Sequence, residues 1–219
     1  MGGNKKVPKY IDPKRAVSSY FSHLSMLENN ASTLYNTLAG KTAVSSVQCL
    51  MQKIASDSRK HSSLLKGMSE KLVMPRATNI ENVTEFGDAF KIIYVMQKDI
   101  EANNKIDEIE LLVLSAKLAI LEKVLNEKYS IVHDRISKII ARSASIFQSS
   151  SLDSFNSFFE RISQDEVEHQ KILAGIEGLI GATEQTVTNV SMEVNISSPE
   201  LSQKDLPLAE SSVDQKGLK

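Results

Sequence analysis

The chain has 219 residues, and its 26 Lys and Arg against 27 Asp and Glu give a formal net charge of −1. This balance gives no reason to expect a nucleic-acid partner, and no stretch approaches the ~20 apolar residues of a membrane span, so we expect no membrane partner either. The single cysteine, Cys49, excludes an intramolecular disulfide and fits a reducing compartment, which predicts a cytoplasmic protein.

The first half of the chain predicts two long helices. Nine Gly, five Pro and no Trp, beside abundant Leu, Ile, Lys and Glu, are typical of an all-α fold. Residues 1–13 form an irregular lead, and a helix follows over 14–39, ended by Gly40. A second helix runs over 43–73 and stops before Pro75. The short loop between them makes the two helices antiparallel neighbours.

The second half repeats this arrangement after a long connection. The connection covers about 74–105 and contains a predicted helix over 83–100. A long helix over 106–143 follows, the Ser-rich run 148–151 interrupts the pattern, and a last helix over 152–180 is ended by Gly181. Residues 14–181 are therefore predicted to form a four-helix bundle of two antiparallel hairpins joined by a crossover. Residues 182–219 have no periodic apolar face and are predicted to be a disordered tail.

Polar residues interrupt the apolar stripe of each long helix. Glu28 stands among apolar residues that recur at steps of three and four, and Glu122 does the same on the third long helix. The second helix has Ser58 and His61 on its stripe, and the fourth has Glu166 and His169. A buried carboxylate is costly unless it is paired or binds a metal. The stripes therefore predict a polar site inside the bundle.

The two hairpins share a spacing pattern. On the first helix of each, a Glu precedes a Tyr by seven residues; on the second helix of each, an Asp precedes a His by four. The residues are Glu28 with Tyr35, Glu122 with Tyr129, Asp57 with His61, and Asp165 with His169. The hairpins are either copies of one ancestral hairpin or converge on one geometry. The tyrosines are core aromatics whose hydroxyl groups can hydrogen-bond a carboxylate.

With these motifs the sequence resembles the ferritin-like superfamily, and within it the rubrerythrin-type di-iron carboxylate proteins, over residues 16–181. Their pattern is one Glu from each of two helices and a Glu-x-x-His motif from each of the other two. The resemblance implies an iron site, with manganese or no metal as alternatives, and it implies that Asp57 and Asp165 orient the ligand imidazoles. The implied metal ligands are Glu28, His61, Glu122, Glu166 and His169.

Ser58 departs from that pattern, because it stands where the family has the Glu that precedes His61 by three residues. Three carboxylates then face the four positive charges of two divalent ions. A modified dinuclear site, a mononuclear site and a scaffold without metal all stay open, and Asp57 is a candidate substitute for the missing carboxylate. Arg59 and Lys60 are expected to face water, and His23 and His133 are expected at the surface.

Three functions follow as alternatives. The first is a di-iron oxidoreductase that reacts Fe(II) with dioxygen or hydrogen peroxide. A peroxidase cycle would need an external electron donor, since the chain has no Cys-x-x-Cys pair. The second is a metal-free helical scaffold that acts as an interaction module, and the third is a coiled-coil adaptor. A homodimer is compatible with the first two.

Overall fold

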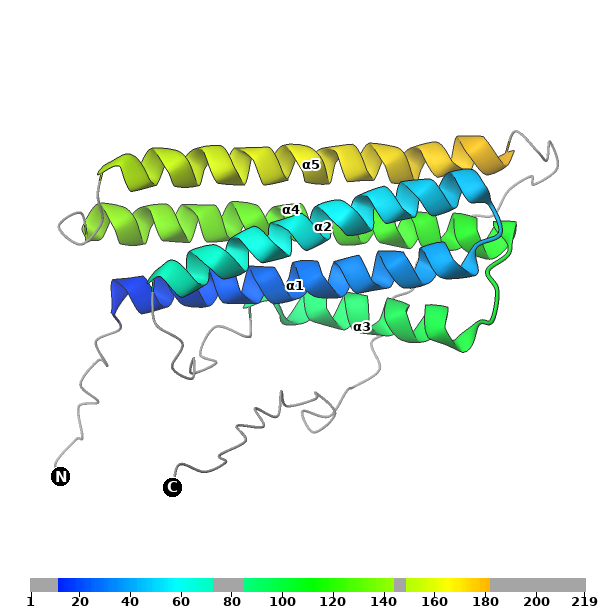
Figure 1. The fold of residues 1–219 in the computed structure, drawn as a ribbon, viewed down its shortest axis with the longest axis horizontal. Helices are drawn as coiled ribbons and strands as arrows, with labels where there is room; N and C mark the ends of the chain where they lie inside the picture. The colour runs from blue at the N-terminus through cyan, green and yellow to red at the C-terminus, as the bar shows by residue number, and fades with distance from the viewer. Residues whose placement is uncertain (1–11, 73–84, 144–148, 182–219) are drawn as a thin grey trace, which may run out of the picture. The chain divides into compact units, whose positions relative to one another are not determined.

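The computed structural model describes residues 12–72, 85–143 and 149–181, and these residues form five α-helices (Figure 1). The helices are α1 (Pro13–Lys41), α2 (Ser45–Leu72), α3 (Gly87–Ala102), α4 (Glu108–Arg142) and α5 (Ser149–Gly181). Within the described ranges the only β-type pairing is an isolated bridge between Thr42 and Ile106. The prediction of an all-α protein is confirmed.

Two of the predicted helix ends are wrong. Gly40 was expected to end the first helix, but α1 continues to Lys41, and the Thr42 N–H closes the last turn by donating to the Leu38 carbonyl. The Ser-rich run was expected to break the pattern, yet residues 149–151 open α5. Serine has only a moderate preference against the helix, so a short run of it can be accommodated in one.

Local capping explains where α1 and α4 begin. Asp12 accepts a hydrogen bond from the Lys14 N–H, and Pro13 occupies the first turn, where no backbone donor is needed. Asp107 and Glu110 form a reciprocal capping box at the start of α4. These caps place the first turn of each helix independently of the packing around it.

Serine side chains join α1 to α2. Ser18 and Ser69 exchange hydrogen bonds with each other's backbone carbonyls, and one heptad further along α1 Ser25 and Ser62 do the same. Another heptad on, Ser32 donates to the Ala55 carbonyl at 2.8 Å. Small side chains at this spacing let two helix backbones approach closely. We call these contacts the serine ladder; it sets α1 and α2 antiparallel and fixes their register.

The other neighbouring pairs of long helices are also antiparallel. In α4 and α5, Asn126 contacts Ser163 and His133 contacts Asn156, so the two helices run in opposite directions. Side-chain contacts give the same result for α1 with α4 and for α2 with α5; they are Tyr35–Glu122, Tyr129–Glu28, His61–Asp165 and Lys53–Glu168. We refer to α1 with α2 as the first hairpin and to α4 with α5 as the second.

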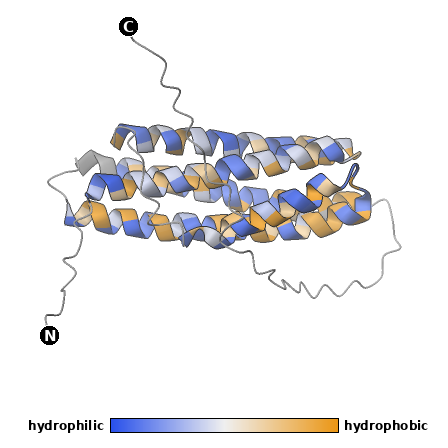
Figure 2. Ribbon diagram, turned by 90° about the horizontal axis from the view of Figure 1, so that it is seen from below, coloured by the Kyte–Doolittle hydropathy of each residue, from blue (hydrophilic) through white to orange (hydrophobic). Residues whose placement is uncertain are grey.

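The core lies between the four long helices. Apolar residues at steps of three and four are buried on every one of them, and hydrophilic residues alternate with them along each helix (Figure 2). Some apolar side chains, among them Leu64, Ile109 and Leu179, are exposed. Phe21 of α1 packs against Phe155 and Phe159 of α5, with ring centroids 5.6 and 6.1 Å apart. This contact links the two hairpins through apolar side chains.

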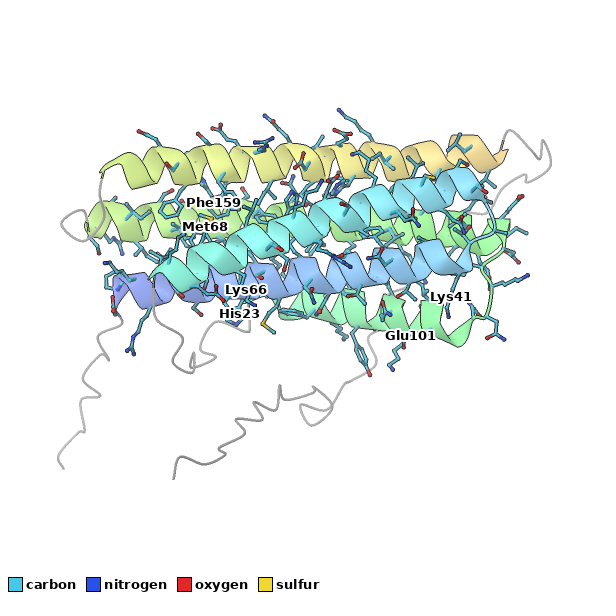
Figure 3. All side chains as sticks on the ribbon, in the orientation of Figure 1. His23, Lys41, Lys66, Met68, Glu101 and Phe159 are labelled. Carbon is cyan, nitrogen blue, oxygen red and sulfur yellow. The ribbon has the colours of Figure 1, made fainter. Side chains whose placement is uncertain are left out.

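Helix α3 packs outside the four, against α1 and α4. Ion pairs tie it to α4 at both ends, Asp88 to Lys128 at 2.7 Å and Asp99 to Lys117 at 3.7 Å. The Lys41 ammonium donates to the carbonyls of Ile100, Glu101 and Asn103, which caps the C-terminal end of α3 (Figure 3). Because α2 and α4 run in the same direction, the chain has to return along the molecule between them, and α3 runs in that return direction.

Parts of the predictions fall outside the described residues. These are most of the lead over 1–13, the start of the crossover, and the disordered tail over 182–219. Among the described helices, none has a stretch apolar and long enough to span a membrane.

The serine ladder can be tested with neighbouring serines of α2. Ser62 contacts Ser25 across the helix pair, whereas Ser63 is exposed. We expect Ser62→Leu to lower the free energy of unfolding by roughly 1–3 kcal/mol, because a larger side chain forces the helices apart. Ser63→Leu should change it by less than about 0.5 kcal/mol. Urea unfolding followed by circular dichroism measures both, and equal effects would show that the helices are not closely packed at Ser62.

Candidate metal centre

All five predicted ligands are buried between the two hairpins. Glu28 comes from α1, His61 from α2, Glu122 from α4, and Glu166 and His169 from α5. Their exposed fractions range from 0% to 4%. Each lies on the apolar stripe of its helix, so the folding of that stripe into the core carries the polar group inside.

The five residues form two groups that share Glu166. Glu28, His61 and Glu166 bring one potential ligand atom each within 4.8 Å of one another, and Glu122, Glu166 and His169 do the same. Each group therefore contains two carboxylates and one imidazole. A carboxylate common to both groups is suited to bridging two cations, because its two oxygens can each bind one.

Both imidazoles turn the same ring nitrogen inward. His61 Nδ1 lies 3.6 Å from Glu28 Oε1 and 3.6 Å from Glu166 Oε1, and His169 Nδ1 lies 3.2 Å from Glu122 Oε2. The other nitrogen, Nε2, faces an aspartate near the surface. His61 Nδ1 has no hydrogen-bond partner, whereas His169 Nδ1 is within hydrogen-bond distance of Glu122, so a metal bound by that nitrogen would replace this contact.

The aspartates serve the histidine of the facing helix. Asp165 of α5 lies 3.0 Å from Nε2 of His61 in α2, within hydrogen-bond distance. Asp57 of α2 lies 3.6 Å from Nε2 of His169 in α5. An aspartate in this position holds a ligand imidazole in orientation and raises its basicity. The spacing of four residues pairs each aspartate with the histidine of its own helix, whereas in the structure each aspartate faces the ring on the other hairpin.

The tyrosines cross between hairpins in the same way. The Tyr35 hydroxyl of α1 donates to Glu122 of α4, and the Tyr129 hydroxyl of α4 donates to Glu28 of α1. Burial, followed by the charges of nearby carboxylates, raises the pKa of both tyrosines well above the ordinary value of 10.0. Both phenols therefore remain neutral hydrogen-bond donors.

These crossed contacts reveal an internal two-fold relation. If Glu28 is matched with Glu122 and His61 with His169, every crossed pair maps onto its counterpart. The packing contacts follow the same correspondence: Ser32 with Ala55 in the first hairpin matches Asn126 with Ser163 in the second. The two hairpins therefore share one helix register, as the repeated spacing pattern predicts.

Burial and neighbouring charges shift the pKa values of the cluster in opposite directions. Burial, followed by the charges of Glu122 and Glu28, raises the pKa of Glu166 well above its ordinary value of 4.5. Burial is the largest single influence on Glu122 and would raise its pKa, but the contacts with His169, Glu166 and Tyr35 together outweigh it and lower the pKa. Burial would lower the pKa of His61, yet the carboxylates of Glu28 and Asp165 raise it.

Several buried atoms of the cluster lack a hydrogen-bond partner. They are Oε2 of Glu28, both carboxylate oxygens of Glu166, Nδ1 of His61 and Nε2 of His169. An unpartnered buried polar atom costs roughly 1–3 kcal/mol, so an arrangement of this kind points to a missing partner. Carboxylate oxygen and imidazole nitrogen suit iron, manganese and zinc. The residues present therefore fit a divalent metal.

Ser58 is buried, with an exposed fraction of 1%, and lies one turn before His61 in α2. Asp57 does not replace the missing carboxylate: its Oδ1 accepts a hydrogen bond from Lys60 at 2.8 Å, and its Oδ2 faces the outer nitrogen of His169. Arg59 and Lys60 are exposed, as expected. Asp57, Arg59 and Lys60 therefore do not take the place of the glutamate that Ser58 replaces.

The prediction that His23 is a surface residue is wrong. His23 is 8% exposed, its ring stacks on Phe86 with centroids 5.4 Å apart, and its Nδ1 lies 2.7 Å from the Ser19 carbonyl (Figure 3). The ring is buried because the start of α3 covers it. His133 is half-buried and its Nε2 lies 2.8 Å from the Asn156 side-chain oxygen. Both histidines have structural contacts away from the cluster.

The raised pKa of Glu166 gives a pH dependence for the metal-free protein. The folded protein binds the Glu166 proton more tightly than the unfolded chain does, and this difference stabilises the folded state. The stabilisation is complete below pH 4.5 and is lost as the pH rises through the raised pKa of Glu166. The pKa of His61 is also raised, so the stabilisation that comes from its protonation is likewise lost as the pH rises above 6.5. We expect stability to fall from pH 6 to pH 9.

Glu166→Gln should remove much of this loss, because the amide has the same shape and no charge. At pH 8, with a chelator present, we expect the variant to be roughly 1–3 kcal/mol more stable than the wild type, and the gain should shrink near pH 5. Urea unfolding at both pH values measures the difference. A gain that does not change with pH would rule out ionisation of Glu166 as its cause.

Comparisons with protein-family models, with curated proteins and with solved structures found no match to this chain, so the geometry above is what supports a functional assignment.

Proposed function

We propose that this protein is a ferritin-like four-helix bundle that binds two divalent metal ions, preferentially iron, and acts as an oxidoreductase on dioxygen or hydrogen peroxide. The antiparallel neighbours and the return direction of α3 are compatible with two hairpins joined by a crossover. The ligand set is the predicted one, Glu28, His61, Glu122, Glu166 and His169.

The observation that carries the proposal is the position of Glu166. Its carboxylate belongs to both metal-compatible groups, its exposed fraction is 0%, and neither oxygen has a hydrogen-bond partner. In a purely structural core such a carboxylate would be destabilising. Divalent cations held by the two groups would neutralise its charge and give its oxygens the partners that they lack.

The surrounding residues would prepare the site for redox chemistry. Bound Fe(II) supplies the electrons that reduce dioxygen or hydrogen peroxide. Tyr35 and Tyr129 fix the Glu122 and Glu28 carboxylates through their hydrogen bonds. Asp165 holds the His61 ring so that Nδ1 points inward. The apolar stripes on all four helices limit the access of water.

The use of cysteine bears on the electron donor and on the cellular location. Cys49 is the chain's only cysteine and is exposed, so a peroxidase cycle would use an external electron donor. We infer a cytoplasmic location from the same cysteine usage.

A metal-free scaffold is the second candidate, and Ser58 is the residue that favours it. With one shared carboxylate absent, the crossed hydrogen bonds could serve the fold alone, and function would lie on the outer surface or with a binding partner. The unpartnered atoms of Glu166 argue against this alternative. Metal analysis separates the two candidates.

Metal content is the first test. Protein reconstituted anaerobically with Fe(II) in a buffer containing acetate should hold about two ions per chain by elemental analysis, because the ligands form two groups. Glu166→Ala should lose both ions, since both groups contain this residue, and Glu122→Ala should lose at least one. Glu168→Ala, an exposed site on the same helix, is the matched control and should retain the wild-type content. No metal in the wild type would favour the scaffold.

Reactivity is the second test. Fe(II)-loaded protein should be oxidised by hydrogen peroxide or dioxygen, as followed by the rise in near-ultraviolet absorbance of Fe(III). Asp165→Asn should slow the oxidation or weaken iron binding by about 10–100-fold, because it removes the anion that orients His61. Asp134→Asn alters an exposed aspartate that pairs with Lys138, and should behave as the wild type. Equal rates for all three proteins and for free iron would contradict a redox role.

A further inference from the structure

Ser58 takes the place that Glu166 holds in the other hairpin. When His61 is matched with His169, Ser58 falls on Glu166, three residues before the histidine in each case. Both residues are buried, with exposed fractions of 1% and 0%. Beyond Cβ the glutamate has a methylene and a carboxylate, whereas the serine has only a hydroxyl. One of two related positions thus supplies a shared anion, and the other supplies a hydroxyl.

Charge also leaves the pair of groups one anion short. Glu28, Glu122 and Glu166 provide three negative charges for two divalent ions, and the Tyr35 and Tyr129 hydroxyls are already hydrogen-bonded to Glu122 and Glu28. Asp57 is bound to Lys60, and Asp165 is bound to the outer nitrogen of His61. The described residues around the cluster therefore offer no further carboxylate to the position beside Ser58.

We propose that a small external carboxylate, of the size of formate or acetate, binds beside Ser58 and completes the metal pair. Carboxylate oxygens are hard ligands suited to these cations, and a carboxylate replaces the group that the serine lacks. The Ser58 hydroxyl is a hydrogen-bond donor for it. His61, one turn after Ser58 in α2, has an unpartnered buried Nδ1, so its group with Glu28 and Glu166 is the one that we expect to depend on this ligand.

The inference rests on the proposed function, and it implies that the second metal ion binds only when an external carboxylate is present. Without a carboxylate the site should hold one divalent ion firmly, in the group of Glu122, Glu166 and His169, where two ligands share one helix face. With a carboxylate it should hold two. A small carboxylic acid would then be a co-ligand or a substrate of the centre.

Titration with Mn(II) in a non-coordinating buffer tests this, with acetate or an equal concentration of chloride. Equilibrium dialysis should show a rise from about one to about two ions per chain with acetate, corresponding to a gain of roughly tenfold or more in affinity for the second ion, and no rise with chloride. Broadening of the acetate carbon resonance by bound Mn(II) gives a direct readout of acetate binding.

Ser58→Glu supplies the missing carboxylate from the chain, so it should bind two ions without acetate and abolish the acetate broadening. Ser58→Asp is a smaller second variant in case the glutamate disturbs the fold, which circular dichroism checks; its affinity for the second ion should also depend less on acetate. Ser63→Glu, an exposed site on the same helix, should retain the wild-type acetate dependence.

The outcomes distinguish this inference from the proposed function. Two ions bound to the wild type without acetate, or a chloride effect equal to that of acetate, would overturn the carboxylate site and leave the metal centre intact. One ion at every acetate concentration would also overturn it. Absence of metal from the wild type and from both Ser58 variants would instead remove the proposed function itself.

Discussion

The structure depends on how a few buried acids and imidazoles find partners. A carboxylate enclosed by Leu and Ile side chains is far less stable than one in water unless another group neutralises or hydrogen-bonds it. In this chain several of these partners lie on the opposite hairpin. Glu28 accepts a hydrogen bond from the Tyr129 hydroxyl, and Glu122 accepts one from the Tyr35 hydroxyl. Asp165 lies within hydrogen-bond distance of His61. The association of the hairpins and the construction of the polar cluster are therefore one event.

The sequence could predict the contents of the cluster because helical periodicity is a local property. A step of three or four residues places Glu166, His169 and their counterparts on the inward face whatever the neighbouring helices do. The crossed pairing of aspartates and histidines could not be predicted in this way, since it depends on the register between α2 and α5. That register is set by contacts far apart in the chain, among them the packing of Phe21 on the rings of α5.

The errors of the sequence reading have equally physical causes. His23 lies just off the apolar stripe of α1, and only the placement of Phe86 at the start of α3 covers it. Gly40 was expected to end α1, but Lys41 is held by the carbonyls at the end of α3, and this tertiary contact accompanies one further residue of helix. The serine ladder could not be predicted from the sequence, because serines at heptad spacing indicate a helix contact only once the facing helix is known.

Ser58 gives the two hairpins different chemical roles within a nearly symmetric frame. The second hairpin supplies the shared carboxylate and the first supplies only a hydroxyl at the matching position. Because Ser58 and Glu166 differ at matching buried positions, the two metal-compatible groups have different surroundings. The surrounding pairs, from Tyr35 with Glu122 to Tyr129 with Glu28, retain their symmetry.

The serine ladder has a consequence for motion. Its hydrogen bonds lock α1 to α2 along several turns, so sliding one helix past the other would break them together. The first hairpin should therefore move as one rigid body. The polar cluster lies on the seam between this body and the second hairpin, where fewer backbone groups are joined. We therefore expect small molecules to reach the interior when the two hairpins move slightly apart, and not by separation of α1 from α2.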